Sequence, residues 1–185
     1  WNNELVLFVD ERSGFKVAGF SSSYAQSYSA LISMDDDLEA HLKNALFPSH
    51  YLVVRADGPK STEYEKGIHT QAALNDALNY FFSKSKTGKV FIENDLRAFA
   101  NPTRMMNIKN ATINLVERLK SPCPSCGTPD FWVTHHIPGL LCDSCGMKTK
   151  ETMATVLECK KCKHKQEVKS NITFADPGKC EFCNP

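Results

Sequence analysis

The first 122 residues of the sequence contain no cysteine, whereas the last 63 residues contain eight. Because about two thirds of the chain lacks cysteine, a disulfide framework of the kind found in short secreted domains is disfavoured. The sequence also lacks a run of 18 apolar residues and a signal peptide, so no membrane-spanning segment is predicted. Eight free thiols are typical of a reducing compartment, and we therefore expect a cytoplasmic protein.

The sequence has no surplus of positive charge, because 22 basic residues are balanced by 21 acidic ones. If eight thiolates bound two Zn²⁺ ions, the formal charge would fall from +1 to about −3. General affinity for a phosphate backbone needs a positive surplus. Two interpretations of the local lysine cluster stay open: it contacts nucleic acid, or it offsets the negative charge of a four-cysteine zinc site. Its members are Lys160, Lys161, Lys163 and Lys165.

The chain starts at Trp1 and enters an apolar segment almost at once, at residues 4–10. We therefore expect that the natural N-terminal part is missing. At 185 residues, the sequence is long enough for one domain with an appendage or for two small domains. We place an α/β domain at residues 1–120, as part of a larger domain, and a metal-stabilised double zinc-ribbon region at residues 121–185.

Residues 1–120 alternate between strand-like and helix-like patterns, which predicts an α/β fold with a mixed, partly parallel sheet. Between these segments, the polar stretches 21–30 and 56–67 are interpreted as irregular chain. Thr70 is expected to cap the second helix and Asn101 the third, with Pro102 at the first helical position. The expected strands are 4–10, 15–20, 51–55 and 90–92, and the expected helices are 35–46, 70–82 and 101–120.

The cysteines form four Cys-x-x-Cys pairs, a spacing that can present two sulfurs to one tetrahedral ion. The first and second pairs are separated by 15 residues and the third and fourth by 17, both within the range typical of zinc sites. The pairs therefore predict two structural Zn²⁺ ions with four cysteine ligands each. The ligands are Cys123, Cys126, Cys142, Cys145, Cys159, Cys162, Cys180 and Cys183.

The chemistry of the cysteines leaves one alternative metal, because a single iron ion also accepts four thiolates. Gly127 and Gly146 follow the first two pairs, where glycine can take the positive φ of a metal knuckle. The later pairs are followed by Lys163 and Asn184, so we expect a less regular second site. Catalytic redox pairs are disfavoured, because they occur singly at a helix start.

Three ways of sharing the ions are compatible with the four pairs. Sequential sharing, first with second and third with fourth, fits the spacing rule twice and is favoured. A nested arrangement of inner and outer pairs is the main rival, and an interleaved cross-brace is the third. Short strand-like pieces surround the knuckles, at residues 131–137, 154–158 and 165–169. With few large aliphatic side chains, this region is expected to depend on metal for folding.

Charged residues concentrate between residues 91 and 104. Glu93 and Asp95 would project to one side at the end of a strand and are candidate catalytic or Mg²⁺-binding carboxylates. Arg97 and Arg104 are candidate ligand-binding forks for phosphate oxygens. His69, before the second helix, is a candidate base or phosphate contact. The alternative is structural: ion pairs that brace the turn, and a polar loop histidine.

The sequence resembles a bacterial family that is defined as a domain of unknown function with paired cysteines near its C-terminus. Before the long helix, that family shows a pattern similar to E-T-D-M-R-A-h-x-N-P-T-R-M. The matching stretches are FPSHYLVVR, KGIHTQAALNDAL, FIENDLRAFANPTRM, CPSCGTPDF, PGLLCDSCG and ADPGKCEFCNP. Residues 4–82 are more faintly similar to inosine/xanthosine triphosphatases, with the Gly-x-x-Thr segment at residues 67–70. The fainter resemblance implies a related fold.

Two functions from different classes follow. In the first, a cytoplasmic bacterial protein binds or hydrolyses a nucleotide or another phosphorylated ligand, as a Mg²⁺-dependent phosphohydrolase, at the α/β domain. In the second, nothing is catalysed, and the zinc ribbons bind nucleic acid or a protein partner. Neither function involves a membrane.

Overall fold

The computed structural model describes all 185 residues, which form two compact units. The α/β unit comprises Trp1–Val6 and Phe20–Ile113. The cysteine unit comprises Leu7–Gly19 and Asn114–Pro185. The N-terminal hairpin and the longest helix each contribute residues to both units. The expected division at residue 120 is not tested by this grouping and stays a prediction.

The chain begins with a two-stranded antiparallel hairpin, as the sequence predicts, made of β1 (Asn2–Asp10) and β2 (Phe15–Ser23). In the turn, the Asp10 carboxylate accepts hydrogen bonds from the Ser13 hydroxyl at 2.6 Å and the Arg12 N–H at 3.1 Å. Gly14 has a φ of +68°, in the left-handed region that glycine enters without steric cost.

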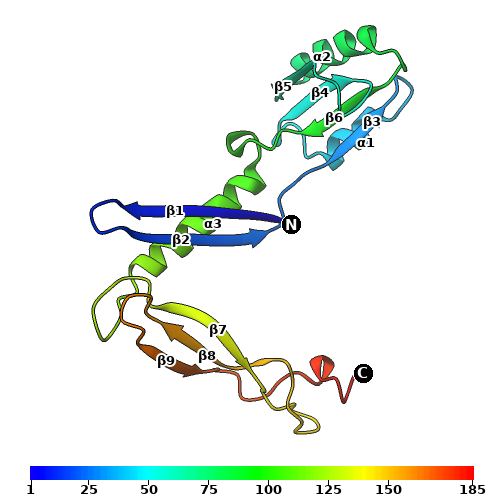
Figure 1. The fold of residues 1–185 in the computed structure, drawn as a ribbon. Coiled ribbons are helices and arrows are strands. Elements are labelled where there is room, and N and C mark those ends of the chain that lie inside the picture. The colour runs from blue at the N-terminus through cyan, green and yellow to red at the C-terminus, as the bar shows by residue number, and fades with distance from the viewer. The chain divides into compact units, whose positions relative to one another are not determined.

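The α/β unit contains a four-stranded sheet in the order β3-β6-β4-β5, with every neighbouring pair antiparallel (Figure 1). One helix connects β3 to β4, and a second connects β5 to β6. The elements are β3 (Ser29–Ile32), α1 (Leu38–Asn44), β4 (Leu52–Ala56), β5 (Tyr64–Ile68), α2 (Gln71–Lys84) and β6 (Val90–Asn94).

The prediction of a partly parallel sheet is wrong. Each helix does connect two strands that run in the same direction, as the strand–helix–strand pattern suggests. An antiparallel strand separates them in both cases: β6 lies between β3 and β4, and β4 lies between β5 and β6. The local pattern sets the direction of the strands, but the strand inserted between them comes from elsewhere in the chain.

Both helices pack on the same face of this sheet. Alternate residues of β4 and β6 point into the core, where Leu52, Val54, Val90 and Ile92 are fully buried. They pack with α1 and with the apolar side of α2 in one cluster of twelve buried residues. The expected cap is confirmed, because the Thr70 hydroxyl accepts a hydrogen bond from the Ala73 N–H at 3.2 Å.

The strands β3 and β5 overlap the ends of the stretches 21–30 and 56–67, which the sequence indicates to be irregular. They are the two edges of the sheet, so one side of each strand has no neighbour and many of their side chains are exposed. Edge strands tolerate polar residues, and the apolar alternation that reveals a strand is therefore weak.

The longest helix, α3 (Pro102–Leu119), follows a short 3₁₀ turn, η1 (Ala98–Ala100). Its expected start is confirmed: the Asn101 side chain accepts a hydrogen bond from the Arg104 N–H at 3.0 Å, and Pro102 is the first helical residue. The same side chain donates to the Gln26 carbonyl at 2.8 Å. None of the helices is both long enough and apolar enough to cross a membrane.

The cysteine unit contains a three-stranded antiparallel sheet in the order β7-β8-β9 (Figure 1). The strands are β7 (Trp132–Pro138), β8 (Thr152–Glu158) and β9 (Lys165–Lys169), as the sequence predicts. A short 3₁₀ turn, η2 (Pro177–Lys179), precedes the last cysteine pair. The strands form a meander, in which the chain reverses direction after each one.

Candidate metal centres

The eight cysteines gather into two clusters, in each of which the four sulfur atoms lie within 4.8 Å of one another. The first and third pairs form cluster 1, and the second and fourth pairs form cluster 2. Cluster 1 is Cys123, Cys126, Cys159 and Cys162, and cluster 2 is Cys142, Cys145, Cys180 and Cys183. The structure thus shows two four-cysteine clusters, each a candidate metal site.

The favoured sequential sharing of ions is wrong, and so is the nested rival. The seven residues of β7 separate the first pair from the second by about 23 Å at 3.3–3.4 Å per residue. Because β8 runs back antiparallel to β7, the third pair returns to the first, and β9 then leads toward the second. The meander therefore interleaves the pairs.

The clusters fit a tetrahedral ion. In cluster 1, the sulfur of Cys123 lies 3.6 Å from that of Cys162. In cluster 2, the sulfur of Cys142 lies 3.8 Å from that of Cys183. Four sulfurs about 2.3 Å from one Zn²⁺ ion would be about 3.8 Å apart at the corners of a tetrahedron. A disulfide, by contrast, brings two sulfurs to about 2.05 Å.

A repeated backbone hydrogen bond shapes all four knuckles. The N–H of the residue four positions after the first cysteine of each pair donates to that cysteine's carbonyl, at 2.8–2.9 Å. Three of these donors, Gly127, Gly146 and Lys163, have φ between +62° and +70°. The fourth donor is Asn184. A tight turn of this kind holds both sulfurs of a pair on one side of the chain.

The expectation of a less regular second site placed both non-glycine knuckles in one cluster, which the interleaving rules out. Because the pairs interleave, each cluster combines one glycine knuckle with one knuckle of another residue. Cluster 1 has Gly127 and Lys163, and cluster 2 has Gly146 and Asn184. Lys163 adopts the left-handed conformation that costs an L-residue about 1–2 kcal/mol.

The thiol pKa values differ within each cluster. The hydrogen bond with the Thr128 hydroxyl, at 3.3 Å, lowers the pKa of Cys126 to about 6. A backbone hydrogen bond at His164 acts to lower the pKa of Cys162, but desolvation and the neighbouring Cys126 raise it to about 11. One thiol of cluster 1 therefore ionises readily while another keeps its proton. Four thiolates need a bound divalent ion, whose binding releases the remaining protons.

Cluster 2 shows the same division. Backbone N–H groups of the knuckle, first that of Cys145, lower the pKa of Cys142 to about 7. The neighbouring Cys145 and desolvation raise the pKa of Cys183 to about 12. In both clusters the first cysteine of each pair is buried and the second is exposed. The buried sulfurs fix the cluster in the fold, and the exposed ones face the solvent from which an ion would enter.

Cluster 1 is joined to the end of α3 through Asp130. This buried carboxylate accepts hydrogen bonds from Arg118 at 2.7 Å and from Lys160 at 2.8 Å. Arg118 also donates to the Ala18 carbonyl at 2.8 Å, which attaches the hairpin. Removal of Asp130 would leave Arg118 without its anion in a largely buried place.

Most of the lysine cluster is paired within the protein. Lys160 contacts Asp130, and Lys165 lies 3.3 Å from the Glu158 carboxylate, which Lys163 approaches at 4.0 Å. Lys161 makes no ion pair. The partners of these lysines are carboxylates and not thiolates, so both interpretations of the lysine cluster stay predictions.

One family model, "Domain of unknown function (DUF6671)", matches residues 1–185. The chain belongs to the DUF6671 family. No curated protein and no solved structure matches the chain significantly. The family description assigns no activity, so any function must be argued from the residues.

Four of the five candidate residues of the α/β domain lie in three ion pairs, and His69 lies in none. Glu93 on β6 pairs with Arg55 on β4, and Arg104 pairs with Glu4 of the hairpin at 2.7 Å. Asp95 is buried, and its carboxylate accepts hydrogen bonds from two guanidinium nitrogens of Arg97, Nε and Nη2. The sequence did not identify Arg55 as the partner of Glu93 or Glu4 as the partner of Arg104. Both are distant in sequence, so only strand pairing and tertiary contact reveal them.

Three of the candidates do meet around Gly67. The Asp95 carboxylate accepts a hydrogen bond from the Gly67 N–H, and ring nitrogen Nδ1 of His69 lies 2.9 Å from the Gly67 carbonyl. A Cβ atom on Gly67 would lie 3.0 Å from Arg97. Burial acts to raise the pKa of Asp95, but the hydrogen bonds from Arg97 and Gly67 lower it overall. The roles of these residues stay predictions.

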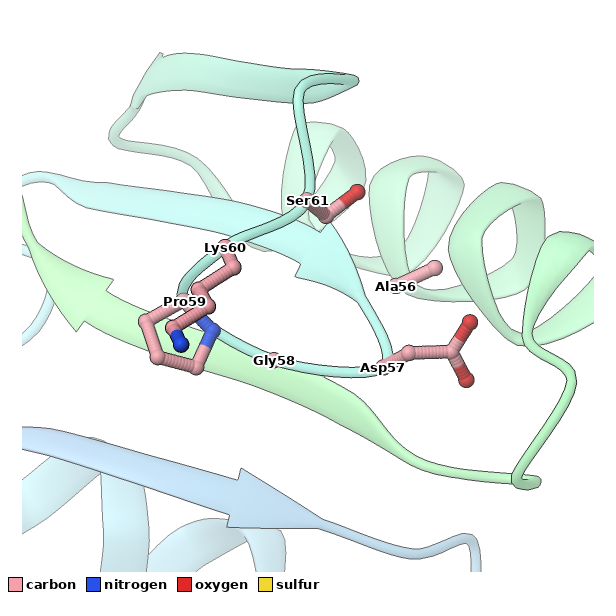
Figure 2. A pocket seen from close by; sticks show the side chains of 6 residues that line it. All are labelled: Ala56, Asp57, Gly58, Pro59, Lys60 and Ser61. Atoms are coloured by element: carbon pink, nitrogen blue, oxygen red, sulfur yellow. The ribbon is translucent and has the colours of Figure 1, made fainter.

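A shallow hollow in the α/β unit is lined by residues 56–61 (Figure 2). Figure 2 shows the Asp57 side chain directed away from Pro59 and Lys60. Its carboxylate accepts hydrogen bonds from the Ser85 hydroxyl at 2.7 Å and the Thr87 N–H at 2.9 Å, which lower its pKa. Asp57 thus closes the turn after α2 and does not supply an acid to the hollow.

Proposed function

We propose that the protein is a non-catalytic binding protein whose cysteine unit is folded by two structural Zn²⁺ ions. The observation that carries the proposal is the placement of two four-cysteine clusters at opposite ends of a three-stranded meander. At one end, an ion would join the knuckle before β7 to the knuckle after β8. At the other end, an ion would join the knuckle after β7 to the knuckle after β9. Two such cross-links would hold all three strands together. The apolar core of this unit is too small to do so by itself.

The composition of this core supports a structural role for metal. The one cluster of buried apolar contacts in the unit consists of Phe131 with Cys123 and Cys159, and Leu157 packs against it. Two of its three buried members are therefore metal-ligand candidates. All four ligands of each site come from the protein, which leaves no open position for a substrate and is typical of structural zinc.

A catalytic Mg²⁺ site is less well supported. Mg²⁺ binds through carboxylate oxygens that are free to coordinate it. Glu93 and Asp95 are each neutralised by an arginine, and Asp95 is almost completely buried. An ion bound by both carboxylates would have to compete with both arginines.

Metal content of double variants tests both the ions and their sharing. We expect two zinc ions per chain in the unchanged protein and one in Cys123→Ser/Cys159→Ser, because both substitutions fall in cluster 1. The control Cys123→Ser/Cys142→Ser removes one ligand from each cluster and should abolish both sites. Elemental analysis after dialysis gives the stoichiometry, and Co²⁺ absorption reports tetrahedral thiolate coordination.

Four results would overturn or correct the proposal. No bound metal in the unchanged protein removes its basis, and iron in place of zinc corrects the cofactor. One retained ion in the control double variant would restore sequential sharing. Nucleoside triphosphate hydrolysis that depends on Mg²⁺ and disappears in Asp95→Asn would favour the phosphohydrolase instead.

A further inference from the structure

One face of the four-stranded sheet carries no helix. Both α1 and α2 pack against the opposite face, as part of a single core. Residues directly opposite each other in an antiparallel pair share a face, so the register defines what this open face displays. One row across the strands reads Leu31, Phe91, Arg55 and Tyr64, and the next reads Ser29, Glu93, Val53 and Lys66.

The open face combines aromatic rings with cations. The Arg55 guanidinium lies 5.2 Å from the centre of the Tyr64 ring, and the Lys66 ammonium lies 5.8 Å from it. Tyr64 is 49% exposed, on the edge strand β5. Its ring therefore has an accessible surface beside two positive charges. At such an exposed strand position, a polar side chain would cost less free energy than an aromatic ring.

The aromatic surface continues past the ends of β4 and β5. The ring of Tyr51 stacks on His69, with centroids 4.7 Å apart, and meets Phe99 edge-on at 6.4 Å. Phe99 is 64% exposed, and the Arg97 guanidinium lies 4.7 Å from its centre. This second group therefore repeats the pairing of an exposed ring with a cation.

The charges of this surface favour an anion. Arg55 and Arg97 are balanced by Glu93 and Asp95, but Lys66 makes no ion pair. Lys60, also without an ion pair, belongs to the 57–61 loop of Figure 2. That loop lies beside the open face, because the Pro59 carbonyl accepts a hydrogen bond from Arg55 at 3.0 Å. Two lysines thus remain available to phosphates.

We propose that this open face, with Tyr64 and Lys66 at its edge and Phe99 and Arg97 at its end, binds single-stranded nucleic acid. Unpaired bases offer flat faces that stack on aromatic rings, and their phosphates attract the unpaired lysines. A duplex hides its bases and would reach only the lysines. The site lies within the α/β unit, so this inference does not depend on zinc in the cysteine unit.

Fluorescence anisotropy with the full, zinc-loaded chain and a labelled 12-nucleotide oligouridylate tests the proposal. Tyr64→Ala and Phe99→Ala should each weaken binding about 5- to 100-fold, the range that loss of one base–aromatic stack produces. Lys66→Gln should reduce the slope of log affinity against log salt by about 0.7. Oligothymidylate of equal length should bind through the same residues, and a duplex of the same length should bind far more weakly.

Matched variants guard against simple misfolding. Tyr80, on α2, is 44% exposed and has Lys84 at 5.5 Å from its ring, so Tyr80→Ala removes an equivalent pair from the other face. This control should leave binding unchanged, and Tyr64→Phe should retain it because the ring remains. Circular dichroism must show that each variant is folded.

The proposal fails if neither single strand binds at 50 mM salt, or if the duplex binds as tightly as the single strands. Equal losses in Tyr64→Ala and Tyr80→Ala would also overturn it. Binding that disappears in Lys160→Gln/Lys161→Gln but survives Tyr64→Ala would place the nucleic acid at the cysteine unit instead.

Discussion

The two units are stabilised by different means. In the α/β unit, twelve buried residues form a continuous core between a sheet and two helices. In the cysteine unit, the buried cluster has three members, of which two are cysteines. Burial of apolar surface can stabilise the first unit by itself. We expect the second unit to take most of its stability from bound metal, so experiments can separate the two.

Metal removal should have the largest effect and should act on one unit only. Structural zinc contributes about 10–16 kcal/mol per site in finger peptides, which equals or exceeds the stability of a whole domain. We expect that a chelator will unfold β7, β8 and β9 while β4, β6 and α2 stay folded. Hydrogen–deuterium exchange resolved by peptide measures both units in one sample.

The reciprocal change is Leu74→Ala in the core of the α/β unit. Leu74 is fully buried, so truncation should destabilise that unit by about 3–5 kcal/mol and leave both zinc ions bound. If chelation alone increased hydrogen–deuterium exchange in β4 and β6, the stability of the α/β unit would depend on the cysteine unit. That result would contradict independent stabilisation of the two units.

The two units should also differ in their response to acid. Burial lowers the pKa of His50, whose ring nitrogen Nε2 accepts a hydrogen bond from the Thr103 N–H at 3.4 Å. The folded state therefore binds the proton more weakly than the unfolded state. This contribution is fully present above about pH 6.5 and is lost as the pH falls through the lowered pKa, with a slope of at most about 1.4 kcal/mol per pH unit.

His50→Gln should flatten this dependence, because glutamine keeps an acceptor and does not titrate. Denaturation followed by the amide resonances of α2, between pH 5 and 7.5, isolates the α/β unit from acid release of zinc. An unchanged slope in the variant would assign the acid sensitivity to other groups.

The smallest expected effect concerns a single knuckle. Lys163→Gly should stabilise the zinc-loaded cysteine unit by about 0.5–1 kcal/mol, because glycine removes the left-handed strain at a higher entropy cost in the unfolded chain. Gly146→Ala, at a φ of +70°, should destabilise it by about 1–2 kcal/mol. Thermal unfolding at fixed zinc concentration compares the two. If both substitutions changed the stability of the cysteine unit by the same amount in the same direction, left-handed strain would not act alike in the two knuckles.

Local signals in the sequence predicted most elements of both units. Thr70 and Asn101 identify the starts of two helices because their side chains satisfy the first N–H groups within three residues. The edge strands were missed because their exposed residues do not alternate clearly. The ion pairs of Glu93 and Arg104 were missed as well, since their partners lie 38 and 100 residues away.

The sequence by itself determined the four cysteine pairs, the caps and most strands, because each depends on residues a few positions apart. The tertiary structure decided which cysteine pairs meet, which strands are neighbours and which carboxylates are neutralised. The physical reason is that a strand of seven residues carries its two ends far apart, so proximity depends on how the strands return. The sequence places three strands between four knuckles, but only the antiparallel pairing of those strands interleaves the clusters.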